Sequence, residues 1–300
     1  MADYNVMSAM SADYQEFTFL ASDALKLYGR KFGWDNPDPT PVVCLAGLTR
    51  NSDDFDSVAR FLASEEGGSR RVVSFDYRGR GKSEYDPNWQ NYDLLKETED
   101  VLAGLTALGL EHVNILGTSR GGLIAMIIGA ARPGILASVI LNDIGPEINV
   151  RGLVRIRKSL EARGKPKSLK EAAAALQSAF GKDFPNLEAD DWHTQATRLF
   201  AEENGKLVTR YDGNVSRSLS NINLDAPLET MWPQFKGLSS IPCMLIHGKL
   251  SDLLTDDIVD KMRSTHPNLV VLQVHDQAHA PLLEDETSQQ AIRQFLAGVK

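Results

Sequence analysis

The stretch VNILGTSRGGLIAMIIGA, residues 113–130, decides how this sequence folds. It starts as a short apolar run that predicts a buried strand, passes through a Gly-x-Ser-x-Gly turn centred on Ser119, and ends in an apolar segment typical of a buried helix. The two glycines permit a turn too tight for larger side chains, which would hold the Ser119 hydroxyl at the carboxyl end of a sheet, beside a helix N-terminus. The stretch predicts a reactive serine; the alternative is a glycine-rich turn that only packs helix against strand.

Short apolar runs on both sides of this stretch predict further strands of the same sheet. They are continuous rather than alternating, which is typical of parallel strands buried on both faces. They lie at residues 42–45, 72–75, 139–141, 243–246 and 269–274. Segments with helical spacing separate them, so we predict an α/β fold with a mostly parallel, doubly wound sheet. Alternating apolar residues at 15–28 predict an additional hairpin.

The alternation of strand and helix stops at residues 146–224. No run there has the pattern of a buried strand, whereas apolar residues recur at helical spacing and Ser168 with Glu171 forms a capping-box pattern. We therefore expect a core built from residues 1–145 and 225–300, with 146–224 as a mostly helical insertion.

A serine hydroxyl becomes a useful nucleophile when a base takes its proton and an acid orients that base. Of the six histidines, His279 lies in Asp-Gln-Ala-His-Ala-Pro, residues 276–281, directly after the last predicted strand. Loops at the carboxyl ends of strands are where α/β sheets gather their chemistry. His279 is therefore the predicted base, whereas His247 and His275 end apolar strands and fit a packing role.

Two aspartates compete for the role of the acid. Asp252 closes the short loop His-Gly-Lys-Leu-Ser-Asp after the penultimate strand, and Asp143 follows the strand that precedes the insertion. We predict Asp252, because its loop leaves the sheet next to the strand that delivers His279. Asp143 remains the alternative.

These features resemble the α/β-hydrolase superfamily, in its serine-nucleophile, carboxylesterase-like branch with a helical cap after the sixth strand. The chain order Ser119, Asp252, His279 is the order of that layout. Asp-Tyr-Arg-Gly-Arg-Gly-Lys-Ser, residues 76–83, matches the family's turn after the fourth strand, and the loops around Asp252 and His279 match its acid and histidine loops. One departure is Ala46, which stands where the family has a histidine that is usually structural.

The resemblance implies a serine hydrolase that cleaves a small-molecule carboxylic ester through an acyl-enzyme, with no cofactor. It also implies that the N–H groups of Leu48 and Arg120 form the oxyanion hole, with Thr49 as the alternative to Leu48. Carbon–carbon bond hydrolases of ring-cleavage products and lactonases are the alternative activities, and a non-catalytic ligand-binding hydrolase fold is a remote one. No metal pattern such as His-Glu-x-x-His is present in the sequence.

Composition narrows the class of protein further. The 300 residues carry 32 Lys and Arg against 40 Asp and Glu, a net charge of −8 that argues against a nucleic-acid partner. The longest nearly unbroken apolar run, residues 121–131, is too short to cross a membrane, and the first residues lack a secretory-signal pattern. Cys44 and Cys243 lie in apolar runs and are predicted to be buried free thiols, which favours a cytoplasmic location.

Residues 151–170 hold eight basic residues and a single acid, Glu161. They fit a solvated face of the insertion. The alternative is a positive rim that attracts carboxylate-bearing substrates.

Overall fold

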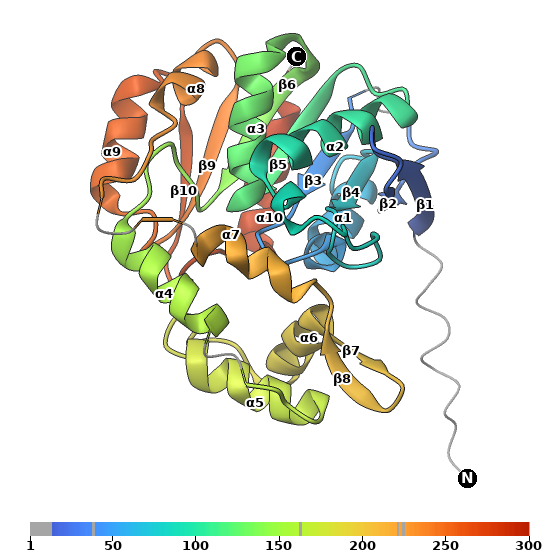
Figure 1. Ribbon diagram of the computed structural model, residues 1–300. Coiled ribbons are helices and arrows are strands. Elements are labelled where there is room, and N and C mark those ends of the chain that lie inside the picture. Colours follow the sequence, from blue (N-terminus) through green and yellow to red (C-terminus); the bar gives the residue numbers. More distant parts are fainter. Residues whose placement is uncertain (1–13, 38–39, 162–163, 221, 224–225, 300) are drawn as a thin grey trace.

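The computed structural model describes residues 14–37, 40–161, 164–220, 222–223 and 226–299. Within these residues eight strands form one sheet, in the order β1-β2-β4-β3-β5-β6-β9-β10 (Figure 1). The strands are β1 Tyr14–Leu20, β2 Lys26–Phe32, β3 Val42–Leu45, β4 Val72–Asp76, β5 Val113–Thr118, β6 Leu136–Asn142, β9 Cys243–Gly248 and β10 Val270–Val274.

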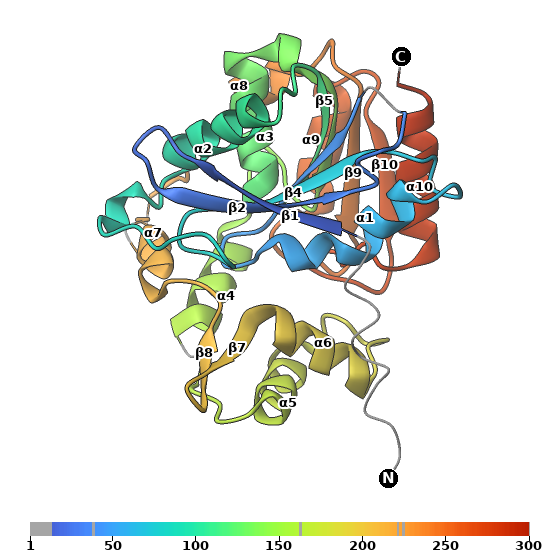
Figure 2. The ribbon, with the colours of Figure 1, turned by 90° about the vertical axis from the view of Figure 1, so that its right-hand side faces the viewer.

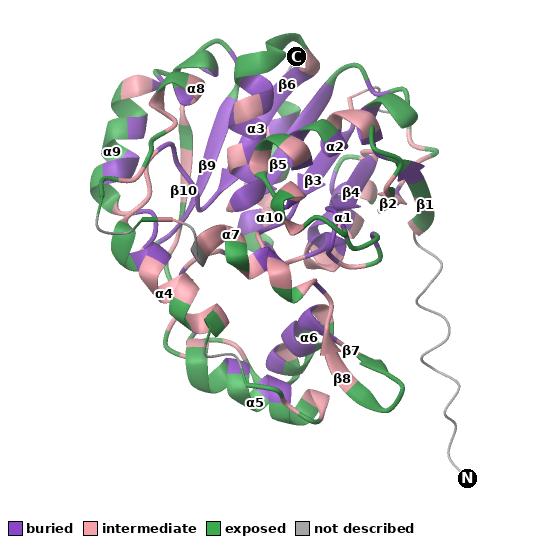
Figure 3. Ribbon diagram, viewed as in Figure 1, coloured by how far each residue is buried: buried purple, intermediate pink, exposed green. Residues whose placement is uncertain are grey.

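The sheet is parallel except at one edge. The predicted hairpin is β1 with β2, and β2 also runs antiparallel to β4, whereas every neighbouring pair from β4 to β10 is parallel. Almost every residue of β3 to β6 and β9 is buried, because helices cover both faces (Figure 3). This burial accounts for the continuous apolar runs and confirms the predicted α/β fold.

Helices lie on both faces of the sheet. On one face α3 packs between α2 and α8, and on the other α1 packs against α10 (Figure 2). Because it is covered by sheet and helices together, α3 is apolar on nearly every side. The elements of the core are η1 Ser52–Phe55, α1 Asp56–Ala63, η2 Trp89–Asn91, α2 Leu94–Ala107, α3 Arg120–Ala131, η3 Pro133–Ile135, α8 Trp232–Gly237, α9 Asp256–Thr265 and α10 Glu286–Ala297.

The segment predicted as the insertion, residues 146–224, has its own hydrophobic cluster, which includes Leu176, Phe184 and Trp192. Figures 1 and 2 show α5, α6 and a small hairpin projecting away from the core. The hairpin was not expected, because its strands are short, only partly buried and lack a buried apolar run; Phe200 begins β7 instead of ending a helix. The elements are α4 Val150–Glu161, α5 Leu169–Phe180, α6 Ala189–Leu199, β7 Phe200–Glu203, β8 Lys206–Thr209, η4 Gly213–Ser216 and α7 Arg217–Ser220.

Two sequence predictions fall on residues outside the described part: the absence of a signal pattern in the first residues, and the end of the insertion at 224–225. In the part that is described, none of the helices combines the length and hydrophobicity that a bilayer crossing requires.

Candidate active site

Ser119 occupies the sharp turn between β5 and α3. Its backbone is held at φ 51° and ψ −112°, a conformation that a non-glycine residue rarely adopts. A Cβ on Gly117 would lie 2.5 Å from the backbone of Gly121, and one on Gly121 would lie 2.1 Å from the carbonyl oxygen of Leu45. The turn can therefore form only with glycines at these positions, as the motif predicts.

His279 lies in the loop that follows β10, and its Nε2 is 2.9 Å from Ser119 Oγ. Hydrogen bonds on both sides of His279 hold this loop over the end of the sheet. The Ala278 N–H donates to the Asp183 carbonyl at 3.0 Å, and the Asn142 amide donates to the Pro281 carbonyl at 2.9 Å. The structure thus brings together the serine and the histidine that the sequence selects.

The carboxylate beside His279 belongs to Asp143, directly after β6. Its Oδ2 lies 2.9 Å from His279 Nδ1, and the side chain is fully buried. Two further donors reach it: the Gly248 N–H donates to Oδ1 at 2.8 Å, and the Ser251 hydroxyl donates to Oδ2 at 2.6 Å. Three hydrogen bonds offset the cost of burying this charge.

Asp252, the predicted acid, is not in contact with His279. Arg155 on α4 instead holds its carboxylate with two hydrogen bonds, Nε to Oδ2 at 2.6 Å and Nη2 to Oδ1 at 2.7 Å. The reason is the course of the loop after β9, where the Leu253 and Leu254 N–H groups donate to Ser251 Oγ. This turn directs Ser251 toward Asp143 and leaves Asp252 facing the insertion, so the carboxylate beside His279 is that of Asp143 and not that of Asp252.

Ser251 was missed by the sequence reasoning, although a signal was present. It stands immediately before Asp252 in the loop that resembles the family's acid loop. That loop still contacts the carboxylate beside His279, because Gly248 and Ser251 donate hydrogen bonds to Asp143.

Leu48 and Arg120 lie on the two backbone segments next to Ser119. Leu48 is in a turn closed by the Arg50 N–H, which donates to the Gly47 carbonyl at 3.2 Å, and it lines the same cavity as Ser119 and His279. Arg120 is the first residue of α3, where a backbone N–H has no partner within the helix. Thr49, the alternative to Leu48, also lines the cavity.

A cavity of about 230 Å³ opens above Ser119 between the core and the insertion. Most of its lining is apolar and comes from both parts: Phe55, Ile156, Leu160, Leu176, Phe180, Phe184, Leu187, Trp192, Leu199, Leu282 and Leu283. Two arginines in the wall are already paired, Arg50 with Asp54 and Gln195, and Arg198 with Glu284. The cavity therefore suits an uncharged, largely apolar group attached to the reacting carbonyl.

Part of the basic stretch is likewise neutralised. Arg155 pairs with Asp183 and Asp252, and Arg157 pairs with Glu161 one helical turn further along α4. These ion pairs favour the interpretation of residues 151–170 as a solvated charged face over their interpretation as a positive rim. Among the described residues no group of three His, Cys, Asp or Glu side chains could hold a metal ion.

Fold and site geometry define an α/β hydrolase, and the chain belongs to the family described as alpha/beta hydrolase fold, whose model matches residues 40–286. It is 29% identical over 276 residues to a 3-hydroxybutyrate-oligomer hydrolase from Cupriavidus necator, covering 88% of this chain and 91% of that protein. The crystal structure of an alpha/beta hydrolase from Novosphingobium aromaticivorans superposes with a TM-score of 0.86 at 32% identity, covering 95% of this chain and 99% of that one. An sn-1-specific diacylglycerol lipase from Danio rerio is 32% identical over 111 residues, 37% of this chain and 33% of that protein.

Proposed function

We propose that this protein hydrolyses carboxylic esters with a triad of Ser119, His279 and Asp143. The observation that carries the proposal is the unbroken chain of hydrogen bonds from Ser119 Oγ through both ring nitrogens of His279 to Asp143, with 2.9 Å at each step. It lies at the base of an apolar cavity, where charges that form during a reaction are poorly screened by water. A packing role would not need a serine in a strained backbone conformation aimed at a histidine.

In the proposed first step, Ser119 Oγ attacks the ester carbonyl carbon while His279 Nε2 takes the hydroxyl proton. The carbonyl oxygen becomes an oxyanion, and the N–H groups of Leu48 and Arg120 are proposed to bind it. His279 then returns the proton to the departing alcohol, leaving the acyl group on Ser119. In the second step a water molecule gives a proton to His279 and attacks the acyl carbonyl; His279 then returns that proton to Ser119 Oγ as the carboxylic acid leaves, which restores the free serine. Asp143 stabilises the imidazolium in both steps.

For the substrate, we propose an oligoester of short hydroxy acids. The support is the likeness to the 3-hydroxybutyrate-oligomer hydrolase, which extends over 88% of this chain. The units of such an oligomer are joined by ester bonds and are small and largely apolar, in agreement with the lining of the cavity.

The two buried free thiols, Cys44 and Cys243, support a reducing compartment such as the cytoplasm.

A fluorophosphonate probe, which phosphonylates activated serines, tests the chemistry. The wild type should be labelled and should hydrolyse nitrophenyl butyrate, whereas Ser119→Ala should do neither. Ser264→Ala is the matched control, because this serine lies on α9 and donates only to the Lys261 carbonyl. Equal labelling of the wild type and Ser119→Ala would overturn the proposal.

A substrate panel tests the specificity. The wild type is expected to prefer 3-hydroxybutyrate trimers over simple nitrophenyl esters, and to be inactive toward lactones and toward dienone acids with a carbon–carbon bond to cleave. Turnover of a dienone acid above that of any ester would instead establish a carbon–carbon hydrolase on the same triad.

A further inference from the structure

Two arginines and one glutamate are buried beneath the backbone segments that carry Leu48 and Arg120. Arg80 lies in the turn after β4, Glu97 in the first turn of α2, and Arg120 at the start of α3. The side chains of Arg80 and Glu97 are fully buried, and that of Arg120 is 10% exposed. Ester hydrolysis as proposed above uses none of these side chains.

The carboxylate of Glu97 joins the two segments through the arginines. Its Oε1 accepts from Arg80 Nη1 at 2.6 Å, and its Oε2 accepts from Arg120 Nε. Arg80 in turn donates from Nε to the Leu48 carbonyl at 2.8 Å. One buried carboxylate is therefore connected to both residues whose N–H groups are proposed to bind the oxyanion.

The surroundings hold Arg80 in one orientation. Its guanidinium carbon lies 5.7 Å from the ring centroid of Tyr77 and 5.4 Å from that of Tyr92, and its Nη1 also donates to the Arg78 carbonyl. The turn that carries it is tied to the chain beyond β8, because the Gly81 N–H donates to the Arg210 carbonyl at 2.7 Å. Burial lowers the pKa of Arg80 below its usual value, although the charge of Glu97 opposes this effect; the charge of Arg120 adds to it.

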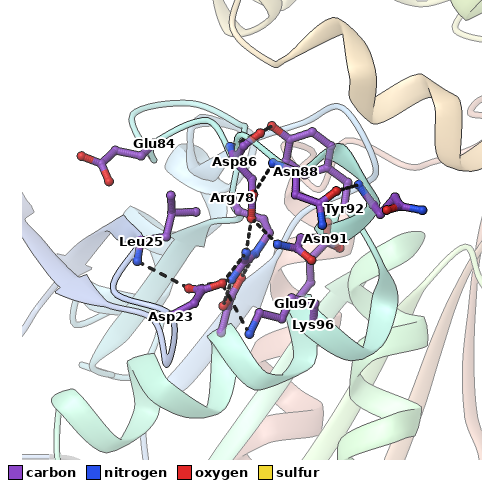
Figure 4. Close-up of polar contacts among 12 residues, drawn as sticks. Asp23, Leu25, Arg78, Glu84, Asp86, Asn88, Asn91, Tyr92, Lys96 and Glu97 are labelled. Atoms are coloured by element: carbon purple, nitrogen blue, oxygen red, sulfur yellow. Dashed lines mark hydrogen bonds and ion pairs between the residues drawn. The ribbon is translucent and has the colours of Figure 1, made fainter.

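The neighbouring charges form a separate cluster around Arg78. Figure 4 shows Arg78 facing Asp23 and Asp86, with Glu97 beside them; Asp100 completes the cluster with two hydrogen bonds to the same guanidinium. Asp100 is one turn along α2 from Glu97 and is also buried, but its partner Arg78 directs its guanidinium to Asp23, Asp86 and Asp100. Glu97 and Asp100 are therefore a matched pair of buried carboxylates. Of the two, Glu97 is connected to the segments that carry Leu48 and Arg120.

We propose that Glu97 is a positioning residue that fixes the separation and direction of the Leu48 and Arg120 N–H groups through Arg80 and Arg120. The inference rests on the proposed ester hydrolysis. Donors that stabilise an oxyanion act only when they point to the position the charged oxygen will occupy, and small displacements are costly. Glu97 touches neither substrate nor reacting atoms, so its effect should fall on the transition state rather than on substrate binding.

The test compares Glu97→Gln with Asp100→Asn. Glutamine keeps the size of the side chain, but its NH₂ group faces one of the two arginine donors. The hydrogen bond from that arginine is therefore lost. We expect kcat for nitrophenyl butyrate to fall by ~10- to 100-fold, with KM changed less than about twofold. The Ki of butylboronic acid, whose boron binds Ser119 Oγ as a tetrahedral anion after His279 takes the proton, should rise by the same factor. Asp100→Asn should lower the melting temperature to a comparable extent while leaving kcat and the boronate Ki unchanged.

A variant of Arg80 keeps the test decisive if Glu97→Gln fails to fold. Arg80→Lys retains the buried positive charge but has a single ammonium group, which cannot hold both Glu97 and the Leu48 carbonyl. It should show the same joint loss of kcat and boronate affinity. Unchanged kcat and boronate affinity in a folded Glu97→Gln or Arg80→Lys protein would overturn the inference, as would an equal loss in Asp100→Asn. Failure of the proposed function is a different result, namely a Ser119→Ala protein that still turns over the ester.

Discussion

The Ser251 hydroxyl donates to Asp143 Oδ2 at 2.6 Å, on the same oxygen that faces His279 Nδ1 at 2.9 Å. The loop that resembles the acid loop of the family thus contributes a hydrogen-bond donor, and the carboxylate comes from the preceding strand of the sheet. Because the carboxylate beside His279 comes from Asp143 and not from Asp252, substitutions of the two aspartates should differ in their effect on activity.

Asp143→Asn is expected to reduce kcat/KM by about 10³- to 10⁴-fold, because an amide in place of the carboxylate favours the wrong tautomer of His279. Asp252→Asn should cost less than about threefold, since Arg155 keeps its second partner, Asp183. Kinetics with a nitrophenyl ester at neutral pH, with circular dichroism to verify folding, measures both. A larger loss in Asp252→Asn would contradict the assignment made from the geometry.

Ser251→Ala removes one of three donors from a buried carboxylate. We expect the free energy of unfolding to fall by about 1–3 kcal/mol and kcat to fall by roughly tenfold, since hydrogen bonds to charged groups are worth more than neutral ones. Urea denaturation and steady-state kinetics provide the two values. Ser264→Ala, an exposed serine of α9, should change neither. Wild-type values for Ser251→Ala would show that the other two donors suffice.

Arg155→Met should loosen the insertion from the core, because Arg155 joins α4 to the loop after β9 through Asp252 and to the chain after α5 through Asp183. Its neighbour Ile156 lines the cavity, so we expect KM for an oligomeric ester to rise several-fold with little change in kcat. The free energy of unfolding should change by less than about 1 kcal/mol, since partly exposed ion pairs contribute little. Arg157→Met is the matched control, because its partner Glu161 is on the same helix. Equal KM values for the two variants would argue against a link between insertion and core.

The two thiols should be inert in the folded protein. Burial raises the pKa of Cys243 to about 12, and burial also raises the pKa of Cys44 well above its usual range. A raised thiol pKa leaves less thiolate at any given pH, so at pH 8 both groups are protonated as well as inaccessible. Ellman's reagent should titrate no thiol in the native protein and both after unfolding in guanidinium chloride. Rapid reaction of the native protein would show that one of the strands β3 and β9 opens locally.

Much of the fold could be predicted because its elements are encoded locally. Continuous apolar runs placed the buried strands to within a few residues, and the glycines around Ser119 defined the turn by steric exclusion alone. The β7–β8 hairpin escaped prediction, since partly exposed strands of four residues carry no strong apolar pattern.

The choice between the two aspartates could not be made from the sequence, because both follow strands that end at the same edge of the sheet. What separates Asp143 from Asp252 is the direction in which the loop after β9 turns, and that direction depends on Ser251 and on Arg155, 96 positions before Ser251 in the chain. The buried bridge of Arg80, Glu97 and Arg120 was invisible for the same reason: its partners come from three separate elements.

Ser119 and Asp143 leave the sheet at the same level of adjacent strands, since Thr118 pairs with Asn142 and the Ser119 N–H donates to the Asn142 carbonyl. Both residues have a φ of 51°. The separation of the proposed nucleophile and acid is therefore set by the ladder between β5 and β6, whereas His279 lies on a loop after β10. Under gradual denaturation this loop should come away first, so that activity disappears while the sheet is still intact and returns at once when the denaturant is diluted.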